Sequence, residues 1–233
     1  ASAHRIDDVK LVEGAGGQNV EFGEAPDPTT TSIGNIKTAG TYITEGTVVA
    51  RGKMAYIIAD NTGAMMVYHK DNERTVGEKI KIEGAVTIYN ATSTPQFSEA
   101  ATVTVISSGN AWTYNPAPMD AAAMDALVTA SPVCKEVQFE GVMAISGNNV
   151  NVTIDGAATA IGSVKYIDNT TIASLDGKKV VVKGYFVGVS ASKYVNVLPY
   201  SVEETGSTPS TDPKITAVNP TSLSFAAAGE AKD

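Results

Sequence analysis

Metal-binding and disulfide-forming residues are scarce in this chain of 233 residues, which contains one cysteine and two histidines. A single thiol cannot form an internal disulfide, and a structural zinc site needs four Cys or His ligands. Cys134 follows Ser131, Pro132 and Val133 at the start of an expected strand, where a small buried thiol is the ordinary interpretation. The sequence therefore excludes an internal disulfide, disfavours a Cys/His zinc site and predicts no cofactor.

Catalytic and membrane-spanning patterns are missing as well. His4 lies near the first residue and His69 ends an expected strand, and neither has a Ser or Asp companion in the local sequence. The glycine-rich stretch 14–17 has neither a following helix nor the Lys-Ser/Thr pair of a phosphate loop. No run approaches the roughly 18 to 20 apolar residues that cross a bilayer. We therefore expect a protein that is not an enzyme and a segment that does not insert into a membrane.

Positive charge is also in short supply, with 17 basic residues against 25 acidic ones and a net charge of −8. Residues 1–35 carry two basic and six acidic groups, residues 36–108 carry seven of each, and residues 135–205 carry six and seven. Proteins bind nucleic acids largely through Lys and Arg side chains that displace condensed counterions. The charge distribution therefore disfavours a nucleic-acid partner.

What the sequence does contain is a tandem repeat. The segment VGEKIKIEG at 76–84 matches LDGKKVVVKG at 175–184. Upstream of these copies, YITEGTVVA at 42–50 matches VQFEGVMAI at 137–145. In each copy a glycine turn leads through Lys into a strand that holds a second glycine. Self-similarity of this kind predicts two domains with the same frame.

Each repeat is expected to form a small closed β-barrel. The 21 glycines and 10 prolines indicate many turns, and the 43% apolar content is that of a globular protein. In the first repeat the expected strands are 42–50, 53–60, 63–69, 78–89 and 100–107. The second and third are joined by the hairpin sequence DNTG at 60–63, because Asn and Gly tolerate positive φ. We predict an all-β fold of two tandem five-stranded barrels.

A short helix is expected between the barrels. Asp120 follows Pro118 as an N-cap, and Met124, Leu127 and Val128 fall on one stripe. Such a helix most simply plugs the open end of a barrel. The composition then divides the chain into an N-terminal strand and linker, the first barrel, the connector with its helix, the second barrel, and a C-terminal linker with a further strand. The corresponding residues are 1–35, 36–108, 109–134, 135–205 and 206–233.

Three segments of the first repeat, 46–50, 56–68 and 76–84, together resemble the bacterial OB-fold modules of secreted multidomain proteins, especially those of Bacteroidetes. In the second repeat the outer parts match, whereas the central hairpin at 149–156 is shorter and more polar. Residues 215–229 resemble the opening of the BACON domain, an immunoglobulin-like module of Bacteroidetes surface proteins linked with carbohydrate or mucin binding. These resemblances imply two OB-fold-like barrels in a secreted or cell-surface protein.

A further resemblance concerns residues 6–11, which are similar to the closing strand of jelly-roll carbohydrate-binding domains. In those domains an Asp at this point often holds a structural calcium, so Asp7 and Asp8 are the corresponding candidate ligands. The rest of such a domain is absent from this sequence. We therefore predict no metal site.

A ligand-binding face is expected on the first barrel, because OB folds bind on the outer face of strands 2 and 3 and on the flanking loops. Strand alternation that turns Ile58 inward sends its neighbours outward. The loop after the fourth strand adds aromatic and amide groups. The candidate ligand-binding residues are Ile57, Met66, Tyr68, Tyr89, Asn90, Gln96 and Phe97. The alternative interpretation is that this apolar face packs against the second barrel or the N-terminal segment.

Three functions fit these features. The first is a non-catalytic interaction or spacer module of a bacterial cell-surface protein, with a neighbouring domain or a glycan as its partner. The second is an OB-fold that binds single-stranded nucleic acid and assists a secreted nuclease or phosphatase. The third is a structural stalk without a ligand. An aromatic ring flanked by amides can stack on a sugar or on a base, so the residues alone do not separate the ligands.

Overall fold

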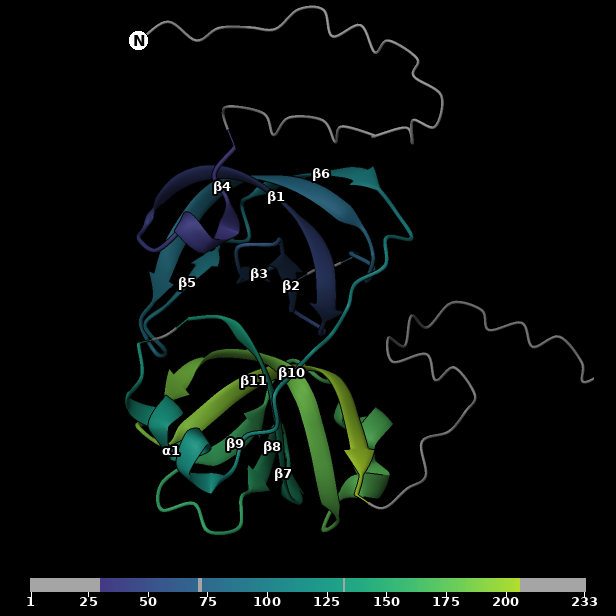
Figure 1. Cartoon of the computed structure of the whole chain (residues 1–233). Coiled ribbons are helices and arrows are strands. Elements are labelled where there is room, and N and C mark those ends of the chain that lie inside the picture. Colours follow the sequence, from purple (N-terminus) through teal and green to yellow (C-terminus); the bar gives the residue numbers. More distant parts are fainter. Residues whose placement is uncertain (1–29, 71–72, 132, 206–233) are drawn as a thin grey trace, which may run out of the picture.

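The computed structural model describes residues 30–70, 73–131 and 133–205, which form two stacked barrels (Figure 1). The candidate metal ligands Asp7 and Asp8 and the expected terminal strands lie outside these residues. Within the described part of the chain, no helix is long and apolar enough to span a bilayer.

The first barrel contains six strands preceded by a short 3-10 helix. The elements are η1 Ile33–Asn35, β1 Gly40–Arg51, β2 Ala55–Ala59, β3 Ala64–Tyr68, β4 Lys79–Tyr89, β5 Thr94–Phe97 and β6 Thr102–Ser107. Five of the strands close a ring in the order β1-β2-β3-β5-β4, because β4 also pairs with β1. The β3–β5 pairing is parallel and the others in the ring are antiparallel. Strand β6 extends the sheet beyond β4.

Strand β5 is the part of this barrel that differs from the prediction. The segment before Ser98 was expected to be a loop, and the strand at 100–107 was expected to close the barrel. Instead, Thr94–Phe97 pairs with both β3 and β4, while the expected fifth strand is β6. Proline cannot donate a ladder hydrogen bond, yet a strand of four residues accommodates Pro95 opposite Ile88.

The second barrel has the same ring of five strands. Its elements are α1 Ala121–Thr129, β7 Lys135–Ser146, β8 Asn149–Thr153, β9 Ile161–Val164, the 3-10 helix η2 Asn169–Leu175, β10 Lys179–Ser190 and β11 Tyr194–Glu204. The ring runs β10-β11-β9-β8-β7 and closes through the β10–β7 pair, again with one parallel pairing, between β9 and β11. Both barrels are therefore closed, five-stranded and mixed, as OB-fold-like modules are.

The repeated glycines perform the same task in both barrels. Gly77 and Gly177 have φ of +90° and +74°, a conformation that L side chains rarely adopt. Each donates its N–H to the first strand of its own barrel at 2.9 Å, to the carbonyl of Val48 and of Met143 respectively. Val48 and Met143 return a hydrogen bond to the same turn, at 2.8 and 2.9 Å. The repeat predicted from the sequence is thus a repeat of the barrel frame.

Helix α1 plugs the second barrel, as the sequence predicted. The Asp120 carboxylate accepts a hydrogen bond from the Ala123 N–H at 2.8 Å and caps the helix. Met124 and Leu127 are buried in the core of the second barrel. The apolar stripe therefore closes one end of this barrel.

The predicted hairpin between β2 and β3 is present, but a different interaction holds it. Neither Asn61 nor Gly63 has positive φ. The Asp60 carboxylate instead accepts hydrogen bonds from the N–H groups of Thr62 at 2.7 Å and Gly63 at 2.9 Å. Its other oxygen accepts one from the Ile33 N–H at 2.9 Å, which ties η1 to the turn.

Candidate functional site

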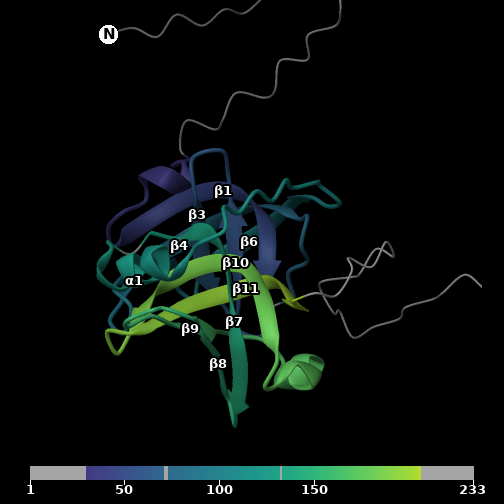
Figure 2. The same ribbon diagram turned by 60° about the horizontal axis from the view of Figure 1, so that its bottom comes forward.

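The outer face of β2 and β3 lies against the second barrel. Ile57 and Met66 are 0% and 2% exposed and belong to an apolar cluster that includes Val187 and Leu198 of β10 and β11. Figures 1 and 2 show β10 and β11 on the side of the second barrel that faces the first. Both candidate side chains therefore lie in the contact between the barrels. This agrees with the alternative interpretation, in which the apolar face packs against the second barrel, and not with an open ligand-binding face.

Polar groups fix the orientation of this contact. The Thr94 hydroxyl donates to the Val187 carbonyl at 3.0 Å, and the Lys53 N–H donates to the Tyr166 carbonyl at 2.6 Å. From the connector, the Tyr114 hydroxyl donates to the carbonyl of Val49 at 2.6 Å. The first two bonds link one barrel to the other, and the third links the connector to the first barrel. Hydrogen bonds are directional, whereas apolar contacts are not, so these bonds favour one relative orientation of the barrels.

Two further candidates, Gln96 and Phe97, lie on β5 rather than on a loop. Phe97 is 0% exposed and packs in the core of the first barrel. Gln96 is 8% exposed, and its Oε1 has no hydrogen-bond partner among the described residues. Neither side chain belongs to an open surface.

The remaining candidates lie along the seam between the barrels. Tyr68 ends β3 and is half-buried, whereas Tyr89 ends β4 and is 46% exposed, with exposed Asn90 next to it in the chain. The second barrel adds Tyr166, whose ring centroid lies 6.4 Å from that of Tyr68. We call Tyr68, Tyr89 and Tyr166 the tyrosine seam.

Tyr166 is the member of the tyrosine seam that sequence reasoning missed. It has a φ of +60°, and its carbonyl accepts the Lys53 N–H. Burial raises the pKa of its phenol, and Tyr89 and Tyr68 raise that pKa further. A side chain at Gly52 would crowd Tyr166, with its Cβ 2.7 Å from the Tyr166 carbonyl oxygen. Among the described residues near the seam, Gly52 is the one whose identity points to Tyr166. Its role can be recognised only from the docked barrels, because Tyr166 belongs to the other barrel.

The cations of the first barrel are largely compensated. Six basic residues could line a groove for nucleic acid, and four of them lie within ion-pair distance of a carboxylate. The pairs are Lys53–Asp168 at 3.2 Å, Lys70–Glu99 at 3.8 Å, Arg74–Glu78 at 3.4 Å and Lys79–Glu45 at 3.1 Å. Arg51 and Lys81, the other two, also have interactions. Four of the six candidate cations are therefore ion-paired within the described residues.

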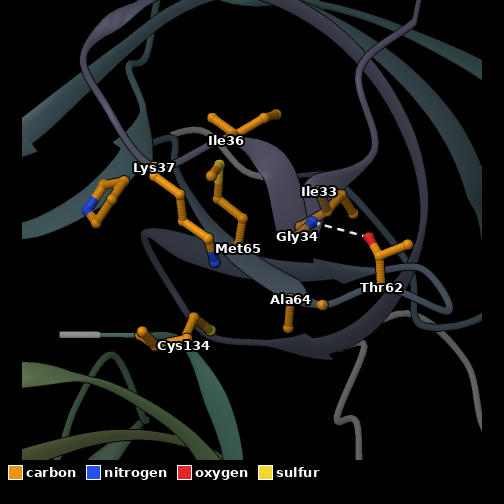
Figure 3. Close-up of a pocket in the computed structure, with 11 residues that line it drawn as sticks. Ile33, Gly34, Ile36, Lys37, Thr62, Ala64, Met65 and Cys134 are labelled. Atoms are coloured by element: carbon orange, nitrogen blue, oxygen red, sulfur yellow. Dashed lines mark hydrogen bonds between the residues drawn. The ribbon is translucent and has the colours of Figure 1, made fainter. Parts of the chain in front are cut away.

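A small pocket of about 60 Å³ lies between the base of the first barrel and the strand that enters the second. Figure 3 shows Lys37 reaching toward Cys134 alongside Met65, with the Gly34 N–H donating to the Thr62 hydroxyl at 2.8 Å. Burial raises the pKa of the Cys134 thiol to about 12, so it stays protonated and is not a nucleophile. This volume holds a few water molecules and falls far below the roughly 300 Å³ of small ligand pockets.

A larger cavity, of about 230 Å³, lies beside β6 in the first barrel. Its lining residues are Tyr56, His69, Glu73, Arg74, Ala101 and Val103. We call it the end cavity. No group of three or more His, Cys, Asp or Glu side chains that could hold a metal ion occurs in the described part of the chain.

Comparisons with known proteins identify no relative of this chain. The sequence matches no model of a known protein family and has no significant match among curated proteins. The features that a function must explain are therefore the docked pair of barrels, the tyrosine seam and the end cavity.

Proposed function

We propose that this chain is a non-catalytic binding and spacer unit of a multidomain bacterial cell-surface protein, in which two OB-fold-like barrels act as one rigid body. The observation that carries the proposal is the burial of the β2–β3 face against β10 and β11. The resemblance to modules of secreted proteins supports the cellular setting.

The connector between the barrels supports rigidity as well. A spacer transmits position only if its parts do not rotate freely, and tandem domains move relative to each other unless their contact is large and apolar. Here Trp112 and Tyr114 of the connector pack into the same apolar cluster as Ile57 and Met66. The Tyr114 and Tyr200 rings lie 4.1 Å apart, so the connector is bound to the second barrel too.

Distances between spin labels would test this proposal. Labels at Glu83→Cys and Asn149→Cys, both exposed, report on the two barrels, with buried Cys134 replaced by Ala. We expect a single narrow distance distribution, as narrow as that of a control pair within the first barrel, Asn61→Cys with Glu83→Cys. A broad or multiple distribution for the first pair alone would mean that the barrels move independently, and the spacer proposal would fail.

A second candidate function is glycan binding at the tyrosine seam, and the position of Tyr166 favours it. Docking brings the Tyr166 ring of the second barrel beside the Tyr68 ring of the first, and aromatic faces stack on flat apolar surfaces such as those of sugar rings. Lys53, close to the seam, is ion-paired with Asp168 at 3.2 Å. A face with aromatic rings and little uncompensated positive charge suits a neutral glycan better than a nucleic-acid strand.

A glycan array probed with the whole chain would test this second function. We expect the variant Tyr89→Ala to lose about tenfold or more in affinity for the glycans that bind, which corresponds to about 1.4 kcal/mol. Tyr194→Ala, at the start of β11, is the matched control and should bind like the wild type. Unchanged binding by Tyr89→Ala would rule out the seam. Binding to oligonucleotides that weakens steeply with salt would favour the nucleic-acid alternative instead.

A further inference from the structure

The end cavity is lined in part by the connection between the third and fourth strands, where the two barrels differ. In the second barrel, η2 occupies this connection and places Ile172 in the core. In the first barrel, the described residues of the connection, 69–70 and 73–78, form no helix. Three of them, His69, Glu73 and Arg74, line the cavity instead. The connection that supplies an apolar core side chain in the second barrel therefore supplies polar lining residues among those described in the first.

The second strand differs in the same region. Val48 pairs with Ile58 in the first barrel, and Met143, its counterpart in the repeat, pairs with Val152 in the second. Two residues before Ile58 is Tyr56, and two before Val152 is Val150. Both belong to the core of their barrel. The first barrel thus carries a phenol where the second carries an isopropyl group.

The cavity is lined by Tyr56, whose buried hydroxyl lacks a hydrogen-bond partner among the described residues. Tyr56 is 1% exposed, yet its hydroxyl has no hydrogen-bond partner among the described residues. Buried polar side-chain atoms nearly always have a partner, so an unpaired one at a cavity wall calls for a group from outside the chain. A phenol both donates and accepts, which favours a ligand with hydroxyl groups.

The charges around the cavity indicate a neutral ligand. The Arg74 guanidinium lies 3.4 Å from Glu78 Oε2, and the carboxylate of Glu73 lines the same cavity. One guanidinium beside two carboxylates does not favour an anion. Glu78 does not line the cavity, and its buried carboxylate balances the charge of Arg74. Ala101 and Val103 supply an apolar wall for the C–H groups of a ring.

From this arrangement we propose that the end cavity of the first barrel binds a small, neutral, polyhydroxylated molecule of the size of a single sugar ring, with the Tyr56 hydroxyl as its hydrogen-bonding partner. The volume of about 230 Å³ supports one ring, since pockets for drug-sized ligands start at roughly 300 Å³. This site is separate from the tyrosine seam and does not depend on it.

Saturation-transfer NMR with the whole chain tests the proposal, with glucose, galactose, mannose and N-acetylglucosamine as probes. We expect at least one sugar to bind with a Kd on the order of 1 mM. Tyr56→Phe removes only the unpaired hydroxyl, so it should weaken that binding about tenfold without lowering the melting temperature. Val103→Phe, which fills the cavity without removing a polar group, should abolish the binding.

Tyr68→Phe is the matched control, because it removes a phenol hydroxyl from the tyrosine seam and leaves the cavity intact. It should bind the sugar like the wild type. The proposal is overturned if none of the four sugars binds, or if Tyr56→Phe and Val103→Phe bind as well as the wild type. It is also overturned if inorganic phosphate or choline displaces the sugar from this site, because a charged ligand would then be preferred.

Discussion

Gly188, in β10, lies close against Thr92 and Thr94 of the first barrel. It has a φ of +108°, and a Cβ at this position would clash with Thr94 Oγ1 and lie 2.6 Å from the Cβ of Thr92. Thr94 in turn donates its hydroxyl hydrogen to the neighbouring Val187 carbonyl. One residue without a side chain thus permits both the backbone path of β10 and the docking of the first barrel.

For this reason Gly188→Ala should destabilise the protein by about 2–4 kcal/mol, from backbone strain plus overpacking. The matched control is Gly147→Ala, because Gly147 also has positive φ, +56°, but a Cβ added there would meet no atom of the described residues within 4 Å. The control should lose only about 1–2 kcal/mol. Urea denaturation measures both values. Equal losses would contradict the close approach at Gly188.

The lowered pKa of Asp125 leads us to expect that the free energy of unfolding depends on pH in the acidic range. Its carboxylate accepts backbone hydrogen bonds from Ala160, Ala158 and Thr159 at 2.7–2.9 Å, and these hold its pKa below the ordinary 3.8. Because the folded-state pKa is lowered, the stabilisation is present above pH 3.8 and is lost as the pH falls through the folded-state value.

We therefore expect the free energy of unfolding to fall with acidification below about pH 4, and to fall less steeply in Asp125→Asn, which has no charge to lose. Carboxyl ¹³C NMR measures the titration directly and should place the Asp125 midpoint below 3.8. A midpoint at or above that value would show that the three hydrogen bonds do not form in solution.

Among the helices, strands and turns, the sequence predicted correctly those features that depend on interactions between residues close in the chain. The turns at Gly77 and Gly177 and the cap at Asp120 depend on neighbours within a few residues, and each could be predicted. Strand β5 could not, because a segment of four residues with Pro95 becomes a strand only when β3 and β4 offer their edges. Pairing between distant segments decides such a short strand, and propensity does not.

Helix α1 yields a prediction at this scale. Leu127 is 2% exposed and packs in the core of the second barrel. Leu127→Ala should lower the free energy of unfolding by about 2–5 kcal/mol, because it removes buried methyl groups and leaves a cavity. Val105→Ala, on an aliphatic side chain of β6 that is 42% exposed, should stay within about 0.5 kcal/mol of the wild type. A small effect at Leu127 would mean that the helix does not plug the barrel.

For the whole molecule, the docking of the barrels decides which candidate site residues are accessible. Strand alternation correctly separated the two faces of β2, but it could not show that the face with Ile57 meets the second barrel. Tyr166 joins Tyr68 through the same docking, although almost a hundred residues separate them in the chain. Both results depend on a contact between repeats, which periodicity within one repeat does not encode.

The most direct test of the account is whether the two barrels share one orientation in solution. Residual dipolar couplings of backbone N–H groups, measured on the whole chain in a weakly aligning medium, give an alignment tensor for each barrel. If the β2–β3 face is docked on β10 and β11, a single tensor will fit the couplings of both barrels in their present relation. Two tensors that differ in magnitude or direction would show that the barrels move independently, and would contradict the central claim of a rigid pair.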